Sequence, residues 1–168
     1  MILTGTEGNQ DHYGMHRRCE LELLAQVATD IGAKQYLELG CGQGCGLEYV
    51  TKALPNIDAV GYEWSMIEPV ALGLRIDRVD LWSDEFAKTL AGLTLKRPLF
   101  VHTDNGNKRR ELAIVAPYLV QGDILGTHDY AGEVTDDKFL TDAGFTLATQ
   151  YEDWIRRCGS LQRFWYAP

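Results

Sequence analysis

The stretch "YLELGCGQGCGLEYV", Tyr36 to Val50, decides the fold, because a short apolar run meets a ladder of glycines. Glycine occupies every second position from Gly40 to Gly46. The segment "QYLEL" has the length and composition of a buried strand, and "LEYVTKAL" has helical spacing and ends before Pro55. Glycines between a strand and a helix let the backbone turn tightly and let a ligand approach it closely. The stretch therefore predicts a strand, a ligand-binding loop and a helix.

The rest of the chain repeats this alternation of strand and helix. Strands are predicted at residues 57–63, near 77–82, at 98–103 and at 123–129, and helices at 16–31, around 86–93, at 111–119 and about 136–143. Two final strands, 145–151 and 161–167, are joined by a short linker and are expected to pair antiparallel at the sheet edge. The pattern predicts an α/β fold, a doubly wound and mostly parallel sheet of seven strands with an antiparallel C-terminal strand and helices on both faces.

Length and composition limit the classes of function. A chain of 168 residues predicts one domain, residues 1–168, and a net charge of -8 disfavours a nucleic-acid partner. No apolar run approaches the roughly 20 residues of a membrane span, and the N-terminus lacks the pattern of a secretory signal. The four cysteines show neither a CxxC pair nor zinc-ligand spacing, so reduced thiols in a cytoplasmic protein are expected.

The ends of the predicted strands carry the informative polar residues. In a parallel sheet, ligands bind outside the carboxyl ends of the strands. Those ends carry Gly40, Glu63, Ser83 with Asp84, Asp104, and His128 with Asp129. Carboxylates at three strand ends indicate a functional edge. His102, within the fourth strand, is expected to be a core histidine with its hydrogen bonds satisfied, or one that supports a ligand residue.

Two classes of cofactor suit the glycine loop. A nicotinamide dinucleotide prefers G-x-G-x-x-G, but counting from Gly40 the last position is Cys45. The alternative is a nucleoside-like cofactor without a pyrophosphate. Glu38 is an acid inside an apolar strand, costly to bury without a partner, and a cationic ammonium or sulfonium ligand would supply one. Glu63 is placed to accept hydrogen bonds from a ribose diol, which both classes contain.

The motifs "ELGCGQG" and "VGYE" resemble the first two motifs of class I S-adenosylmethionine-dependent methyltransferases, and the likeness in strand order runs from about residue 20 to the end. The resemblance implies a Rossmann-like fold in which the loop cradles the methionine part of the cofactor. It also implies that Glu38 lies near the cofactor amino group, that Glu63 binds the ribose hydroxyls, and that Ser83 or Asp84 sits by the adenine. The loop residues concerned are Gly40, Cys41, Gly42 and Gly44. The N-terminal residues 1–15 are expected to fold over the cofactor as a lid or to fray.

The segments "VHTDNGNKRREL" and "GDILGTHDY" resemble metal-dependent O-methyltransferases of the catechol type and their relatives acting on sugars and antibiotics. The implied ligands of a divalent cation are Asp104, His128 and Asp129. Two carboxylates favour Mg²⁺, while a histidine shifts the preference toward Mn²⁺, Fe²⁺ or Zn²⁺. The family pair is usually Asp-Asn or Glu-Asp, whereas this chain has His-Asp. Lys108 is the candidate base beside Asp104, although the family base lies three residues after the acid, where this chain has Asn107.

The sequence thus predicts a methyltransferase that uses S-adenosylmethionine and acts on a hydroxyl of a small molecule or sugar, with a possible divalent cation. A homodimer covering the cleft would suit this enzyme. One rival is a non-catalytic cofactor-binding subunit that works beside a partner, because the short fold leaves little chain for substrate insertions. The other rival, an NAD-dependent oxidoreductase, is disfavoured by Cys45.

Overall fold

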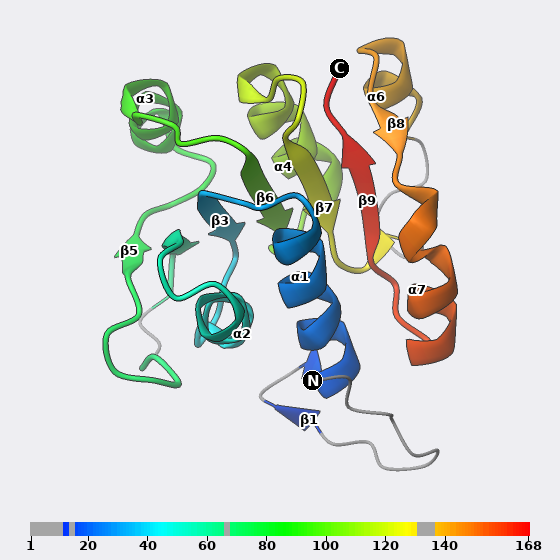
Figure 1. Cartoon of the computed structure of the whole chain (residues 1–168). Helices are drawn as coiled ribbons and strands as arrows, with labels where there is room; N and C mark the ends of the chain where they lie inside the picture. Colours follow the sequence, from blue (N-terminus) through cyan, green and yellow to red (C-terminus); the bar gives the residue numbers. More distant parts are fainter. Residues whose placement is uncertain (1–11, 14–15, 66–67, 131–136) are drawn as a thin grey trace.

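A sheet of seven strands forms the centre of the molecule, as the computed structural model shows for residues 12–13, 16–65, 68–130 and 137–168 (Figure 1). The strand order is β5-β4-β3-β6-β7-β9-β8. The first five strands in this order are parallel, and β9 is antiparallel to both of its neighbours. The bounds are β3 Gln35–Leu39, β4 Asp58–Glu63, β5 Ile76–Arg78, β6 Leu99–Thr103, β7 Ile124–Thr127, β8 Thr146–Leu147 and β9 Arg163–Tyr166. The predicted fold class is confirmed.

Helices cover both faces of this sheet and enclose two apolar cores (Figure 1). One core gathers side chains of α3, α4 and α6, and the other gathers side chains of α1, α2 and α7. All five residues of β3 and of β6 are buried, as expected for central strands covered on both faces. The helices are α1 Arg18–Asp30, α2 Cys45–Ala53, α3 Asp84–Gly92, α4 Lys108–Val115, α6 Lys138–Asp142 and α7 Glu152–Cys158, with 3-10 turns η1 Ala116–Tyr118 and η2 Thr149–Tyr151.

The parallel ladder runs one residue past the ends of β6 and β7. The backbone N–H of Asp104 donates to the carbonyl of Leu39 at 2.7 Å, and that of His128 donates to Thr103 at 3.0 Å. Both residues are therefore fixed by sheet hydrogen bonds at the carboxyl edge. Residues of even number in β3 and β6, among them Glu38 and His102, share the face covered by α1 and α2, because successive side chains alternate.

Three sequence-based boundaries need correction. The third strand ends at Arg78 rather than near Ser83, because this edge strand pairs with β4 over only three residues. The strand expected at 145–151 is limited to two residues and then becomes η2. The linker between the last two strands contains helix α7, whose Trp154 and Ile155 pack against the core beside α1. The antiparallel pairing of the last two strands is confirmed.

The N-terminal part contributes a small hairpin outside the main sheet. Strand β1, His12–Tyr13, pairs antiparallel with β2, His16–Arg17, which leads directly into α1. Most of the lid expected at residues 1–15 lies outside the described residues, so that expectation stays a prediction. In the described part of the chain, no helix has both the length and the apolar character needed to cross a membrane.

We predict that Gly40→Ala destabilises the fold more than Gly42→Ala. Both glycines have positive φ, 78° and 51°, so both variants are strained by about 1–2 kcal/mol. A Cβ on Gly40 would also lie 2.6 Å from the backbone N of Asn105, whereas one on Gly42 would have no atom within 4 Å. In urea unfolding, the free energy of unfolding of Gly40→Ala should be lower than that of Gly42→Ala by at least ~1 kcal/mol. Equal losses in the two variants would contradict the close approach of the two loops.

Candidate functional site

The glycine loop carries only two side chains between Gly40 and Gly44, of which that of Cys41 is buried and that of Gln43 is exposed. Gly42 and Gly44 have positive φ, and the N–H of Gly44 donates to the carbonyl of Cys41 at 2.8 Å, closing a tight turn before α2. The thiol of Cys41 turns inward, so close to β4 that a Cβ on Gly61 would lie 2.5 Å from its sulfur. Burial raises the pKa of this thiol, so it stays protonated. A ligand at the loop would therefore meet main-chain groups.

Glu63 ties this loop to the end of β4. Its Oε2 accepts the N–H of Gly42 at 3.0 Å, and its Oε1 accepts the N–H groups of Trp64 and Ser65 and the hydroxyl of Ser65. The carboxylate thus lies at the predicted position beside the loop, where it is engaged by the protein. A ribose diol would share or replace these donors.

Glu38 is a buried acid without enough partners. Its Oε2 has no hydrogen-bond partner, and a Cβ on Gly46 would lie only 2.3 Å from its Oε1, so the carboxyl group fills the space beside the first turn of α2. Burial raises its pKa to about 8. The nearest basic group is His102, whose Nδ1 lies 3.7 Å from Oε1. An acid held in this way at the loop suits a ligand that brings a positive charge.

His102 departs from the expected core histidine with satisfied hydrogen bonds. It is fully buried, and neither ring nitrogen has a hydrogen-bond partner. Burial lowers its pKa to about 3, so the ring is neutral and cannot neutralise Glu38. The expectation of satisfied hydrogen bonds was wrong, because the acceptor on the neighbouring strand, Oε1 of Glu38, lies 3.7 Å from Nδ1, beyond hydrogen-bond distance.

The predicted residues of the strand-four and strand-five ends come together. Nδ1 of His128 lies 3.4 Å from Asp104 and 3.2 Å from Asp129, and Nζ of Lys108 lies 3.3 Å from Asp104. Lys108 also donates to the carbonyl of Asn105 at 2.5 Å and is almost fully buried. Asp129 has φ of 50°, a strained conformation for a residue with a side chain, which commonly marks a functional position.

Two residues that the sequence did not single out complete this cluster. His16, from β2, places Nε2 3.4 Å from Oδ2 of Asp104, and Glu20, from the first turn of α1, places Oε1 3.4 Å from Nε2 of His128. The sequence did contain a signal for Glu20, since an acid shares the apolar face of α1 with Leu23, Leu24 and Val27. His16 carried no comparable signal, because only the tertiary fold brings the N-terminal segment to the strand ends.

The charges in this cluster support one another. Burial alone would raise the pKa values of Glu20 and Asp104, but the hydrogen bonds and the charge of His128 outweigh it and lower both to about 2. Burial would lower the pKa of His128, yet its bonds to Asp104 and Glu20 raise it to about 10. The cluster is therefore three carboxylates, those of Glu20, Asp104 and Asp129, around an imidazolium. Within the described residues, two groups could each hold a metal ion, one made by His16, Glu20 and His128 and one by Asp104, His128 and Asp129.

Ser83 and Asp84 lie at the start of α3, five or more residues beyond the end of β5. The hydroxyl of Ser83 accepts the N–H of Phe86 at 3.2 Å and caps the helix, and Asp84 is exposed in the first turn. Both side chains have a structural role here, since hydrogen-bond acceptors and acids stabilise a helix N-terminus. A contact with adenine stays a prediction.

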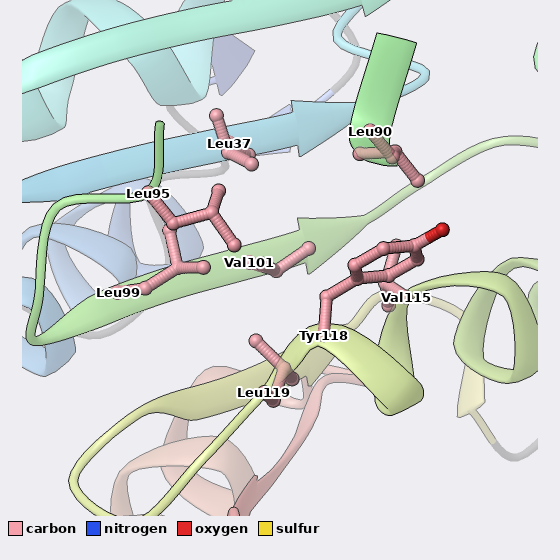
Figure 2. Close-up of a pocket in the computed structure, with 8 residues that line it drawn as sticks. All are labelled: Leu37, Leu90, Leu95, Leu99, Val101, Val115, Tyr118 and Leu119. Carbon is pink, nitrogen blue, oxygen red and sulfur yellow. The ribbon is translucent and has the colours of Figure 1, made fainter. Parts of the chain in front are cut away.

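A cavity elsewhere in the described structure is too small and apolar to be the site (Figure 2). It measures about 10 Å³ and lies between β3, β6, α3 and α4, with Leu99 at the amino end of β6 in its wall. Apart from Tyr118, its lining is aliphatic. It is a packing defect of one core, whereas the polar groups gather at the carboxyl edge of the sheet.

We predict that Glu38→Gln changes how stability depends on pH. Since the pKa of Glu38 is raised, the folded state holds its proton while the unfolded state loses it, and stability falls as pH rises from about 4.5 to about 8. The variant has no such loss, so its free energy of unfolding at pH 8 should exceed that of wild type by on the order of 4 kcal/mol. Denaturant unfolding at pH 5 and pH 8 measures this difference.

The exposed Glu85→Gln serves as the control and should follow wild type at both pH values. Parallel pH curves for wild type and Glu38→Gln would show that Glu38 is ionised in the folded protein.

Comparison with known proteins finds likeness in structure alone. No model of a known protein family matches this sequence, and no curated protein does. CmcI-N160 without ligand is 14% identical with a TM-score of 0.68, covering 99% of this chain and 82% of that one, and its structure with SAH is 11% identical with a TM-score of 0.64, covering 96% and 87%.

Two further structures show the same likeness. A protein provisionally assigned as an O-methyltransferase from Klebsiella pneumoniae is 14% identical with a TM-score of 0.62, covering 90% of this chain and 81% of that one. The O-methyltransferase TomG from Streptomyces achromogenes, in complex with SAM, is 13% identical with a TM-score of 0.55, covering 89% and 80%. At these identities the likeness concerns the fold, and the chain has the Rossmann-like fold of class I S-adenosylmethionine-dependent methyltransferases.

Proposed function

We propose that this protein is a methyltransferase that uses S-adenosylmethionine and transfers its methyl group to a hydroxyl of a small molecule or sugar. The observation that carries the proposal is Glu38, a buried acid with an unpartnered oxygen beside the glycine loop. S-adenosylmethionine carries an ammonium and a sulfonium, so it offers the positive charge that Glu38 lacks beside it. The fold shared with TomG and CmcI-N160, whose structures contain SAM and SAH, supports the same cofactor.

The roles of the other loop residues follow from their positions. Gly40, Gly42 and Gly44 leave the backbone open to the methionine part of the cofactor, and Glu63 would accept the ribose hydroxyls in place of some of its present donors. Methyl transfer is an in-line displacement, so the protein has to align an acceptor oxygen with the methyl group and help to remove the acceptor's proton. The cluster around Asp104 lies at the adjoining strand end and would orient that acceptor.

Lys108 is a weak candidate for the base that removes the acceptor's proton. Its Nζ is bound to Asn105 and lies close to Asp104, which holds the ammonium among acceptors inside the protein. A divalent cation would lower the pKa of a bound hydroxyl and reduce the need for a strong base. We retain Asp104, His128 and Asp129 as one ligand set for such a cation, since two carboxylates and an imidazole lie close together there.

We predict that S-adenosylmethionine and S-adenosylhomocysteine bind the protein and that NAD does not. Calorimetry measures the three affinities. Glu63→Gln should weaken the affinity for S-adenosylmethionine at least about fivefold, because one charge-assisted hydrogen bond is lost. Glu85→Gln should leave this affinity unchanged. A measurable heat of binding with NAD, and none with S-adenosylmethionine or S-adenosylhomocysteine, would refute S-adenosylmethionine as the cofactor.

Turnover separates the enzyme from a non-catalytic subunit that only binds the cofactor. We expect S-adenosylhomocysteine to form from S-adenosylmethionine when the protein is offered a panel of catechols, phenols and sugars. The chelator EDTA should lower that rate, because a cation activates the hydroxyl. An unchanged rate with EDTA would remove the cation from the mechanism, and binding without turnover on every acceptor would favour the subunit.

A further inference from the structure

Three ligand-type side chains converge from segments that are far apart in the sequence. His16 comes from β2, Glu20 from α1 and His128 from the end of β7, and one ligand atom of each lies within 4.8 Å of the other two. Oε1 of Glu20 is 3.4 Å from Nε2 of His128, and the two imidazole rings meet edge to face with centroids 5.3 Å apart. Two imidazoles and a carboxylate with positions left open form a ligand set typical of first-row transition metals.

Asp104 orients both rings from the other side. Its Oδ2 lies 3.4 Å from Nε2 of His16, and its Oδ1 lies 3.4 Å from Nδ1 of His128. A carboxylate bound to one nitrogen of a histidine fixes the tautomer, so that the other nitrogen can bind a metal. This leaves Nδ1 of His16 and Nε2 of His128 as the nitrogens available to an ion, and an ion at Nε2 would displace the proton that the His128 imidazolium carries there.

The available nitrogen of His16 has no other partner. Nδ1 is buried and makes no hydrogen bond with any described residue. A buried polar atom in this state costs free energy that a bound ion would recover. Glu20 is only 5% exposed, and the side chains of His16 and His128 are 14% and 15% exposed, so an ion here would be shielded from most water.

We propose that His16, Glu20 and His128 bind a first-row divalent transition metal ion and that Asp104 is the positioning carboxylate behind them. This site differs from the set of Asp104, His128 and Asp129 in using the opposite nitrogen of His128. It also avoids the ammonium of Lys108, which lies 3.3 Å from Oδ1 of Asp104 and would repel a cation placed on that oxygen. The binding site does not depend on methyl transfer.

Titration of the metal-free full-length protein with Co²⁺ tests the proposal through the visible absorption of the bound ion. We expect one equivalent to bind the wild type, and His16→Ala and Glu20→Gln to lose this binding. Asp104→Asn should weaken it about 10- to 100-fold, because the rings lose their orientation. The exposed Glu85→Gln should bind as the wild type does.

Circular dichroism of each variant shows whether it is folded. A second measurement needs no variant: pulsed electron paramagnetic resonance on the wild type loaded with Cu²⁺ counts the coordinated imidazoles, and we expect two. The proposal is overturned by a single coordinated imidazole, by a wild type that binds no Co²⁺, or by folded variants in which Asp129→Asn loses binding while His16→Ala and Glu20→Gln retain it.

Discussion

The largely buried carboxylate of Asp104, whose side chain is 14% exposed, is the group around which the carboxyl edge of the sheet is organised. An ionised carboxylate away from water costs several kcal/mol unless charged or hydrogen-bonded partners surround it. Asp104 gathers His16, Lys108 and His128, which come from β2, α4 and the end of β7. Its own backbone is held by Leu39 of β3. One acid therefore ties four parts of the chain together at the place where a ligand of this fold would bind.

The glycine ladder has two causes in the folded protein, crowding by neighbouring groups and backbone conformation. A side chain at Gly40 would meet the backbone of Asn105, and one at Gly46 would meet the carboxyl group of Glu38. Packing therefore requires these two glycines. Gly42 and Gly44 have positive φ, which the turn between β3 and α2 requires. The regular spacing of glycine in the sequence thus combines crowding, most severe at Gly40 and Gly46, with positive φ at Gly40, Gly42 and Gly44.

Much of the fold and part of the site could be predicted because they depend on local patterns. Strand and helix alternation placed Glu38, Glu63, Asp104 and His128 at or near the correct strand ends, where the parallel ladder gathers them. The sequence could not place His16 and Glu20 beside His128, because that contact depends on how α1 docks, over a separation of 108 residues for Glu20. The third strand was placed too late, since a short edge strand carries little apolar pattern.

The neighbouring groups explain why Glu38 and the cluster around Asp104 hold their protons differently. In the cluster, an imidazolium and an ammonium keep Asp104 ionised. At Glu38 the basic group within ion-pair distance, His102, is neutral because burial disfavours its charge, and the buried acid holds a proton itself. The negative charge of Glu38 is therefore available only when a cation arrives beside it. If the proposed cofactor supplies that cation, its binding and the loss of the Glu38 proton are one coupled event.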